Sequence, residues 1–522
     1  MLRRTFVARL LPAASIGLAA GMPGFGLAAQ RSASASSGSG SGAAPDAART
    51  EPARDPALKG PIEEQSADVV VVGSGAAGLS AGLAALEAGA KNVVILEKSA
   101  SAGGHTILSS GSVTAVEPEH VAALEQAMLE AGGGLNNPEL VRTLARQSWD
   151  AHEWLAHHGV SWTSVPFRAV GSPGAWSYST GSAQAGYDYV QCLLQAFRRR
   201  GGRMLFRTQA SSLLFVAPDA PEGAGGSESV MKTQPAVAGI FASRPMGQNL
   251  LIRTKAVVIA SGGFTANKAM VAAFRPDIDP DTPTTANPHK QFLDGSTGDG
   301  ILMAQRAGAK LVDMNSIEVV PFTGGRLTDY VGGEIWLNSE GRRFVSEGAS
   351  FDIIRERILE QPNSQMWAIS DVKSSKGATL PVKLMSGTVA SADTIEDLAR
   401  GIGVPVSVLK NTLERWNRSV RDGWDKDFDR PIPEQGQTID APPYFYGEEF
   451  FSIHYTCGGI AINAKAQTLD RQGLPIPGLF AAGETTGGVH GKSRLGGCGL
   501  LDCFVFGRIA GIEAAGLAAR GA

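Results

Sequence analysis

The sequence has little cysteine, and its cysteines are not spaced to hold a metal or an attached haem. Of 522 residues, four are cysteine: Cys192, Cys457, Cys498 and Cys503. None lies in a C-x-x-C or C-x-x-C-H pattern, so we expect no iron–sulfur, zinc or c-type haem site. Such residues usually pack as small apolar side chains, although Cys498 and Cys503 could pair in an oxidising compartment.

The chain also has no large net charge of either sign. The formal net charge is −3 at pH 7, so the chain has no basic footprint and we expect no nucleic-acid partner. A mildly apolar stretch at residues 7–27 is interrupted by the turn-forming residues Pro12, Gly17, Gly21 and Pro23. It is too broken for a membrane span, so we expect a protein that is not integral to the membrane.

Glycine, in contrast, is abundant at 65 residues, and the most informative glycines follow a predicted strand. The apolar β-branched run 69–72 predicts a buried parallel strand. In Gly73-Ser-Gly75-Ala-Ala-Gly78 the first glycine permits a tight turn, the second lets backbone approach a pyrophosphate, and the third lets helix and strand pack closely. A second apolar run ends in Glu97, placed for ribose hydroxyls. The pattern predicts dinucleotide binding.

A glycine pair downstream favours FAD over a nicotinamide cofactor. Gly103 and Gly104 follow Glu97 by six and seven residues, and in FAD enzymes of this type such a pair lies near the pyrophosphate. Glu484 is expected to meet the ribityl hydroxyls, and a helix that begins at Gly499 and Leu500 can stabilise negative charge on the reduced flavin. Further cofactor contacts are expected at the backbone and side chains of Ala77, Lys98, His105, Thr106, Gly111, Gly262, Asp299 and Gly483.

The predicted fold is α/β, a Rossmann-type FAD-binding domain of the two-dinucleotide type with an inserted α+β capping domain. A small β-meander at 204–253 and a buried strand ending at Gly262 close the first FAD-binding part, 66–309. Residues 310–455 differ in composition, with four of the eight tryptophans and several prolines. We predict that they form the capping, substrate-binding domain. Residues 456–522 form the second FAD-binding part.

The N-terminal 30 residues predict an export signal. Arg3 and Arg4 precede the apolar stretch, and the small residues Gly26, Ala28 and Ala29 suit signal-peptidase cleavage. The alternative is a tail that merely begins with two arginines. Because the twin-arginine route carries folded proteins with their cofactor inserted, we expect a periplasmic location. Residues 31–65, rich in Ser, Gly, Ala and Pro, predict a disordered linker.

The segment GETTGGVHGKSRLGG, residues 483–497, makes the chain resemble the flavoprotein of the fumarate reductase and succinate dehydrogenase family. The resemblance spans about residues 67–511, is closest to the soluble fumarate-reductase-like members, and extends to the related 3-ketosteroid dehydrogenases. It implies hydride transfer at a C–C bond next to a carboxylate. By the same resemblance, Arg494 matches the arginine that clamps the substrate carboxylate, and His454 matches the histidine that assists it.

Two departures from the family pattern point away from fumarate itself. The family's second substrate histidine falls on the segment Val320-Pro-Phe322-Thr, which has no histidine, and its proton-transferring arginine falls on Phe351. Both changes remove polar groups, so a substrate with one carboxylate and an apolar or aromatic remainder fits better. By the same resemblance, Asp329 and Tyr330 lie where the family's proton-relay acid would lie. These two residues and Arg355, which shares a face with Phe351 if that stretch is helical, are candidates for the missing proton donor, although each has an ordinary reading as a solvated or capping residue.

The sequence therefore predicts an exported, FAD-dependent oxidoreductase acting on the CH–CH group of a small carboxylate, with the direction open. Electrons would pass through a separate carrier, either quinone-linked or a cytochrome. The alternatives are a ketosteroid-type dehydrogenase with Tyr330 or Tyr455 as base, a flavin-dependent isomerase or hydratase, and a non-catalytic FAD-carrying subunit. His105 stands where membrane-bound relatives carry a covalent flavin link, but the preceding Ala-Gly-Gly favours a non-covalent contact.

Overall fold

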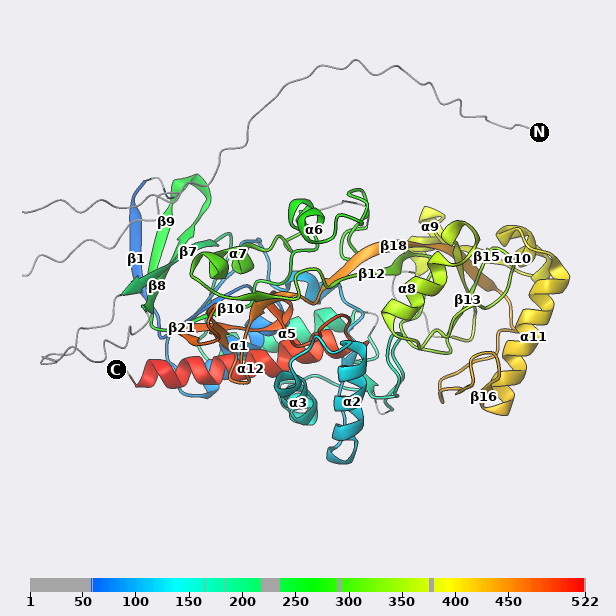
Figure 1. Cartoon of the computed structure of the whole chain (residues 1–522), viewed down its shortest axis with the longest axis horizontal. Helices are drawn as coiled ribbons and strands as arrows, with labels where there is room; N and C mark the ends of the chain where they lie inside the picture. The colour runs from blue at the N-terminus through cyan, green and yellow to red at the C-terminus, as the bar shows by residue number, and fades with distance from the viewer. Residues whose placement is uncertain are drawn as a thin grey trace, which may run out of the picture. The chain divides into compact units, whose positions relative to one another are not determined.

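The strands and helices follow the predicted order around the glycine-rich turn (Figure 1). The computed structural model describes residues 58, 60–163, 165–182, 184–216, 235–288, 290, 293–374 and 380–520. The predicted signal peptide and the linker up to residue 57 lie outside these residues. None of the described helices is long and apolar enough to cross a bilayer.

A six-stranded sheet forms the centre of the FAD-binding part, in the order β20-β21-β10-β2-β3-β6. Five strands are parallel neighbours and the edge strand β20 is antiparallel. Their bounds are β2 (Val69–Val72), β3 (Val93–Leu96), β6 (Arg203–Leu205), β10 (Val257–Ile259), β20 (Gln467–Leu469) and β21 (Pro475–Ala481). The apolar run 69–72 is almost wholly excluded from water, as expected of a parallel strand that is covered on both faces.

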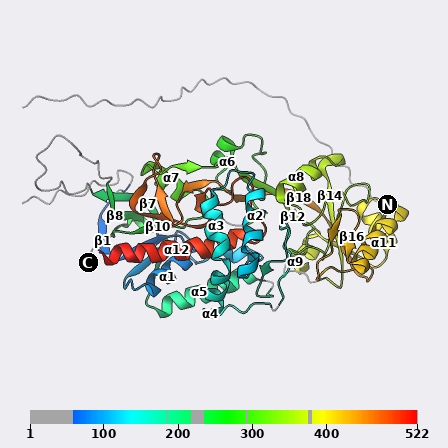
Figure 2. The same cartoon turned by 60° about the horizontal axis from the view of Figure 1, so that its bottom comes forward.

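Two helices of small residues cover this sheet. Helix α1 (Ala76–Glu87) and the C-terminal helix α12 (Cys498–Ala519) run side by side in both views (Figures 1 and 2). A Cβ on Gly507 would lie 2.6 Å from the carbonyl oxygen of Ala77, and one on Gly511 would lie 2.1 Å from that of Ala81. The missing side chains therefore let the two helix backbones touch, which fixes the start of α12 close to the glycine-rich turn.

The predicted meander is a second sheet, in the order β1-β9-β8-β7. It contains β1 (Ile62–Ser66), β7 (Gln209–Val216), β8 (Ala236–Ser243) and β9 (Asn249–Arg253). The predicted linker is wrong at its end, because residues 62–65 belong to β1, which pairs in parallel with β9. Ile62 packs against a small apolar cluster of Leu214, Phe241 and Leu251. This packing favours a strand at residues 62–66 despite the polar composition of the segment.

Helices and short strands surround these sheets. Residues 121–157 contain three helices, α2 (Val121–Ala131), α3 (Pro138–Arg146) and α4 (Ser148–His157). The other elements of this part are β4 (Val113–Thr114), β5 (Ser177–Tyr178), α5 (Ala185–Arg199), α6 (Lys268–Phe274) and α7 (Asp299–Arg306). Strands β11 (Leu311–Val312), β19 (Gly459–Ala461) and β22 (Thr486–Gly487) form a small sheet, so Leu311 and Val312 pair with the second FAD-binding part.

A five-stranded sheet with its own apolar core lies in the segment predicted to be the capping domain (Figure 1). Its strands are β12 (Ile317–Gly324), β13 (Ile335–Leu337), β14 (Met366–Asp371), β15 (Ala390–Ala392) and β18 (Tyr444–Thr456). Its helices are α8 (Phe351–Leu359), α9 (Leu380–Ser386), α10 (Ile395–Ile402) and α11 (Val406–Asp422), with a hairpin of β16 (Trp424–Asp425) and β17 (Arg430–Pro431). The long strand β18 pairs with β14 and β15 at its start and with β12 along its second half.

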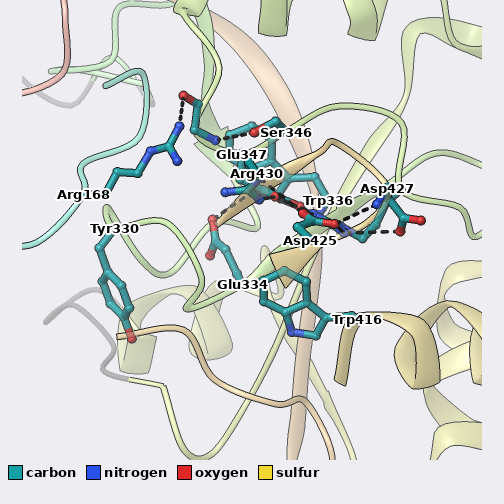
Figure 3. A network of polar contacts seen from close by, with 12 residues as sticks. Arg168, Tyr330, Glu334, Trp336, Ser346, Glu347, Trp416, Asp425, Asp427 and Arg430 are labelled. Carbon is teal, nitrogen blue, oxygen red and sulfur yellow. Dashed lines mark hydrogen bonds and ion pairs between the residues drawn. The ribbon is translucent and has the colours of Figure 1, made fainter. Parts of the chain in front are cut away.

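A buried network of charges holds the segment before α8 in place (Figure 3). Arg343 pairs with Glu347 at 2.9 Å and with Asp425 at 2.7 Å. Arg430 pairs with the same Glu347 at 2.6 Å, and Arg168 donates to the carbonyl of Gly348 at 2.9 Å. Buried ion pairs add little net stability but are costly to break on one side. The network therefore fixes the chain just before Phe351, where α8 begins.

Candidate active site

The glycine-rich turn has the close backbone approaches that the motif predicts. Gly73 has a φ of +101°, and a Cβ there would lie 2.4 Å from the carbonyl oxygen of Ala260. A Cβ on Gly78 would lie 1.9 Å from the carbonyl oxygen of Gly73. Gly75 is the residue before α1. Neither Gly73 nor Gly78 can therefore carry a side chain without moving the strand β10 or the turn.

Polar side chains tie this turn to its neighbours. Glu97 accepts hydrogen bonds from the backbone N–H of Ser74 at 3.1 Å, from the Ser74 hydroxyl, and from the N–H of Ser99 at 2.7 Å. The hydroxyl of Thr106 accepts from the N–H of Ala76 at 3.0 Å. Glu97 thus lies at the strand end, as predicted, and also orders the turn through Ser74. The sequence analysis did not single out Ser74.

A cavity of about 430 Å³ joins the two FAD-binding parts in front of this turn. Predicted cofactor residues from both parts line it, namely Gly73, Gly75, Ala77, Glu97, Lys98, Gly104, His105, Thr106, Gly262, Asp299 and Glu484. A Cβ on Gly262 would meet no atom within 4 Å, so this backbone borders open space. A glycine-lined cavity at the carboxyl ends of parallel strands fits a dinucleotide that needs close backbone approach.

The other predicted cofactor residues shape the backbone around the cavity. A Cβ on Gly111 would lie 2.3 Å from the Cβ of Ala185, and one on Gly483 would lie 2.8 Å from that of Ala77. Gly103 has a φ of +127°. Helix α12 begins at Cys498, one residue earlier than predicted, so Gly499 and Leu500 occupy its first turn.

Two ion pairs stand at the cavity. Lys98 Nζ lies 2.7 Å from Asp299 Oδ2, and although burial works to raise the pKa of Asp299, the lysine holds it below its ordinary value. His105 Nε2 lies 2.5 Å from Asp294 Oδ1. Burial lowers the pKa of His105, but the hydrogen bond and charge of Asp294 outweigh it, so that pKa is raised. Asp299 therefore has a partner outside helix α7, and Asp294 favours the charged form of His105.

Arg494 and His454, predicted from the resemblance to bind a carboxylate, lie in contact. The Arg494 guanidinium donates from Nη2 to Nε2 of His454, a separation of 2.5 Å. Burial and the charge of Arg494 lower the pKa of His454 well below its usual value, so the imidazole is neutral. Because Nε2 accepts from Arg494, the ring proton lies on Nδ1, which is buried and has no hydrogen-bond partner among the described residues. The site thus holds one buried cation, Arg494, and one hydrogen-bond donor without a partner among the described residues, Nδ1–H of His454.

Aromatic rings surround this pair. The Arg494 guanidinium carbon lies 4.9 Å from the ring centroid of Tyr455 and 5.3 Å from that of Phe351. Phe322 stands nearly perpendicular to both Phe351 and His454, with centroid distances of 5.4 Å and 4.7 Å. Phe322 and Phe351, identified as departures from the family pattern, therefore lie together beside the predicted carboxylate clamp.

Two residues that were not predicted from the sequence lie beside Arg494 and Phe322. Glu318, on β12, accepts from the backbone N–H of Arg494 at 2.8 Å. Arg326 lies with its guanidinium carbon 4.5 Å from the ring centroid of Phe322 and forms a 2.8 Å ion pair with Glu334. A buried acidic residue within an apolar strand, as at Glu318, is the signal that would have found the first, because such a carboxylate needs a partner.

The proton-donor candidates lie in different surroundings. Arg355 is half-buried on α8, where its charge helps to lower the pKa of Asp277, after the larger effect of the Arg275 hydrogen bond. Tyr330 lies in the loop between β12 and β13, and a Cβ on Gly333 would meet its ring at 2.5 Å. The neighbouring Asp329 accepts from the Ser112 hydroxyl at 3.0 Å. These candidates for the proton donor stay predictions.

Tyr455, the base of the ketosteroid-type alternative, is buried beside the clamp. Its hydroxyl has no hydrogen-bond partner among the described residues. Burial raises the pKa of Tyr455 well above its usual value, which disfavours the phenolate that a base would need. All four cysteines are free thiols, and no group of three metal-ligating side chains occurs in the described chain.

Comparison with known proteins agrees with this geometry. The family described as "FAD binding domain" matches residues 68–500. A urocanate reductase of Eggerthella lenta is 34% identical over 483 residues, which cover 86% of this chain and 75% of that protein. The open conformation of a flavocytochrome c3 fumarate reductase is 32% identical, with a TM-score of 0.62, covering 87% of this chain and 79% of that one.

A 3-ketosteroid-Δ4-(5α)-dehydrogenase from Rhodococcus jostii has a similar fold, with 26% identity, a TM-score of 0.63 and coverage of 86% of this chain and 97% of that one. Together these matches confirm the predicted α/β flavoprotein fold and FAD as the cofactor. They also confirm the resemblance stated from the segment at 483–497.

Proposed function

Because the chain belongs to the FAD-dependent fumarate reductase and succinate dehydrogenase flavoprotein family, we propose that its substrate is an unsaturated acid with one carboxylate and a planar, apolar or aromatic remainder. The chain is an FAD-dependent oxidoreductase that acts on the CH–CH group of its substrate. Reduction of the double bond is the proposed direction. The name urocanate reductase, borne by one relative, supports it.

The observation that carries the proposal is a single cationic clamp bordered by two phenylalanines. Arg494 is 8% exposed and keeps its charge in this pocket, since burial lowers its pKa but Glu318 and smaller effects of other neighbouring groups together more than offset that. A guanidinium is the natural bidentate partner of a planar carboxylate. Phe322 and Phe351 stand where a second polar clamp would be needed for a dicarboxylate, so they favour an apolar remainder.

Each residue of the site has a defined part in the proposed reaction. When bound, FAD supplies the hydride-transfer chemistry. Arg494 holds the carboxylate and draws electron density toward it, which makes the conjugated double bond electrophilic. His454 offers its Nδ1–H to a substrate oxygen, and the two phenylalanines exclude water. A proton must then reach the second carbon, for which Arg355 and Tyr330 remain the proposed donors.

The cellular setting is part of the same proposal. Arg3 and Arg4 support export by the twin-arginine route to the periplasm, and the separate electron carrier is a cytochrome or a quinone-linked protein. The relation to a flavocytochrome c3 fumarate reductase supports the cytochrome. Residues 310–455 act as the capping domain, with β12 and β18 carrying Phe322 and His454 to the clamp.

Anaerobic mixing tests the proposal. The holoprotein is reduced with dithionite, freed of excess reductant, and mixed with trans-cinnamate, acrylate, fumarate or 4-androstene-3,17-dione while flavin absorbance is followed. We expect trans-cinnamate to reoxidise the flavin fastest, with fumarate slower and the steroid inactive. Fastest reoxidation by fumarate or by the steroid would contradict the assignment. Substrate turnover by the oxidised protein without any change in flavin absorbance would indicate an isomerase.

A further inference from the structure

Glu318 is a buried acid directly beneath the carboxylate clamp. It lies on β12 opposite Tyr455 of β18 and is 5% exposed. Its Oε1 accepts from the backbone N–H of Arg494 at 2.8 Å and from the Ser493 hydroxyl at 3.3 Å, and the thiol of Cys457 lies 3.9 Å away. Oε1 therefore fixes the main chain on which the clamp is built.

The second oxygen of Glu318 has a different environment. Oε2 lies 3.3 Å from Nε of Arg494, an ion pair without hydrogen-bond geometry. Among the described residues it accepts no hydrogen bond, although it is buried. The Arg494–Glu318 pair thus consists of one cation and one anion, and Oε2 of the glutamate has no hydrogen bond that would prevent it from taking up a proton.

The charge balance of the pocket changes when an anion enters. Arg494 and Glu318 cancel, so a substrate carboxylate brings an uncompensated negative charge into a site that excludes water. The other charged groups around the pocket already have partners of opposite sign. Arg326 is paired with Glu334 at 2.8 Å, and His105 with Asp294 at 2.5 Å. His490 is paired with Asp502 at 3.2 Å, Asp352 of α8 is paired with Lys492 at 2.6 Å, and His454 is neutral.

We propose that the substrate carboxylate binds together with one proton, and that Oε2 of Glu318 takes up that proton. The step is balanced, because one proton leaves the solvent, the glutamate anion becomes a carboxylic acid, and no electrons move. The Arg494 cation is then left to the substrate. This inference rests on the proposed function, which makes Arg494 the carboxylate clamp.

The direction of the pKa shift agrees with this role. Burial raises the pKa of Glu318, and the charge of Arg494 offsets only part of that rise. A second carboxylate near Arg494 raises it further, so the complex holds more protons than the free protein. The dissociation constant of a carboxylate ligand is then lowest below the Glu318 pKa of the free protein, and rises by up to about tenfold per pH unit above it.

The test uses oxidised holoprotein and phenylacetate, which has one carboxylate and a ring but no CH–CH bond to oxidise or reduce. Binding is followed from pH 6 to 9 by the flavin difference spectrum, and proton uptake by phenol red in weakly buffered solution. We expect the dissociation constant to rise with pH and proton uptake to approach one per ligand. Glu318→Gln should bind with a pH-independent constant and take up no proton, whereas Glu318→Asp should keep the uptake.

Glu449→Gln is the matched control, because Glu449 is also a buried acid of the same sheet but contacts Arg326 rather than Arg494. It should keep the pH dependence and the proton uptake of the unaltered protein. If phenylacetate binds without proton uptake, or with equal uptake in Glu318→Gln, the inference is wrong while the clamp stands. If no acid binds at any pH, the clamp itself is wrong and the inference fails with it. The unaltered protein decides these outcomes even if Glu318→Gln does not fold.

Discussion

The ring of Phe322 stands at 81° to the imidazole of His454, with 4.7 Å between the ring centroids. The guanidinium carbon of Arg326 lies 4.5 Å from the centroid of the same ring. Phe322 therefore contacts both the neutral histidine beside Arg494 and a buried cation of the capping segment. A polar side chain at this position would be in contact with both.

Phe322 is expected to determine which acids the protein uses. Phe322→Leu should lower kcat/KM for trans-cinnamate by up to about tenfold, because an aromatic pair contributes roughly 0.5–1.5 kcal/mol beyond burial. The value for acrylate, which has no ring, should change less than threefold. Steady-state kinetics with both acids and an artificial electron donor measure the ratio.

Phe428→Leu provides the control for this substitution. Phe428 lies against Arg343 at 4.8 Å, much as Phe322 lies against Arg326, but in the charged network before α8. This variant should leave the ratio between the two acids unaltered. An equal loss with both acids in Phe322→Leu would mean that this ring does not contact the substrate.

The glycine-rich turn should be essential for FAD retention. In Gly78→Ala the new methyl would lie 1.9 Å from the carbonyl oxygen of Gly73, so β2 and α1 must separate. We expect less than a tenth of the FAD content after purification. Gly516→Ala, in the open part of α12 with no atom within 4 Å, should keep full FAD and gain roughly 0.5–1 kcal/mol of stability. Full FAD content in Gly78→Ala would contradict the assigned packing.

FAD should be released by acid, despite the position of His105. Nε2 of His105 is hydrogen-bonded to Asp294 at 2.5 Å, and this contact raises the pKa of the imidazole against the effect of burial. The share of neutral ring that could attack the flavin methyl group is therefore reduced. Trichloroacetic acid should therefore give a yellow supernatant and a colourless pellet. A fluorescent protein band after denaturing electrophoresis would instead reveal a covalent link.

Export should depend on the arginine pair at the N-terminus. Replacing Arg3 and Arg4 with lysine should leave FAD-loaded precursor in the cytoplasm, because the twin-arginine route reads both residues. Cell fractionation with a flavin-fluorescence assay measures the distribution. Undiminished periplasmic protein would refute this route, and a single Arg3→Lys variant provides the graded comparison.

The cofactor cradle could be predicted from the sequence because its geometry is local. The glycine spacing at residues 73–78 and the acid at 97 belong to one strand–helix–strand unit, whose backbone requirements appear directly as residue types. The end of the linker was misjudged for the opposite reason. Whether residues 62–65 form a strand depends on the distant β9, which the composition of the segment does not reveal.

The clamp was predictable only in part. Arg494 and His454 were predicted from the resemblance to the family, but Glu318 lies 176 positions before Arg494 in the sequence, and the pairing of β12 with β18 brings its strand to these two residues. Arg326 is similarly hidden, because its stacking on Phe322 depends on how the loop after β12 folds back around Glu334. Contacts between residues that are far apart in the sequence leave no pattern of spacing from which they could be predicted.

The kcat/KM for trans-cinnamate of a protein without the Arg494 charge tests the central claim most directly. Arg494→Gln combined with Glu318→Gln removes the buried pair together, so that no uncompensated charge is left to unfold the protein. With FAD content unchanged, kcat/KM for trans-cinnamate should fall by a factor of about 10² to 10⁴, on the order of 3–5 kcal/mol. Turnover of trans-cinnamate within threefold of the unaltered protein in the double variant would show that Arg494 does not hold the carboxylate.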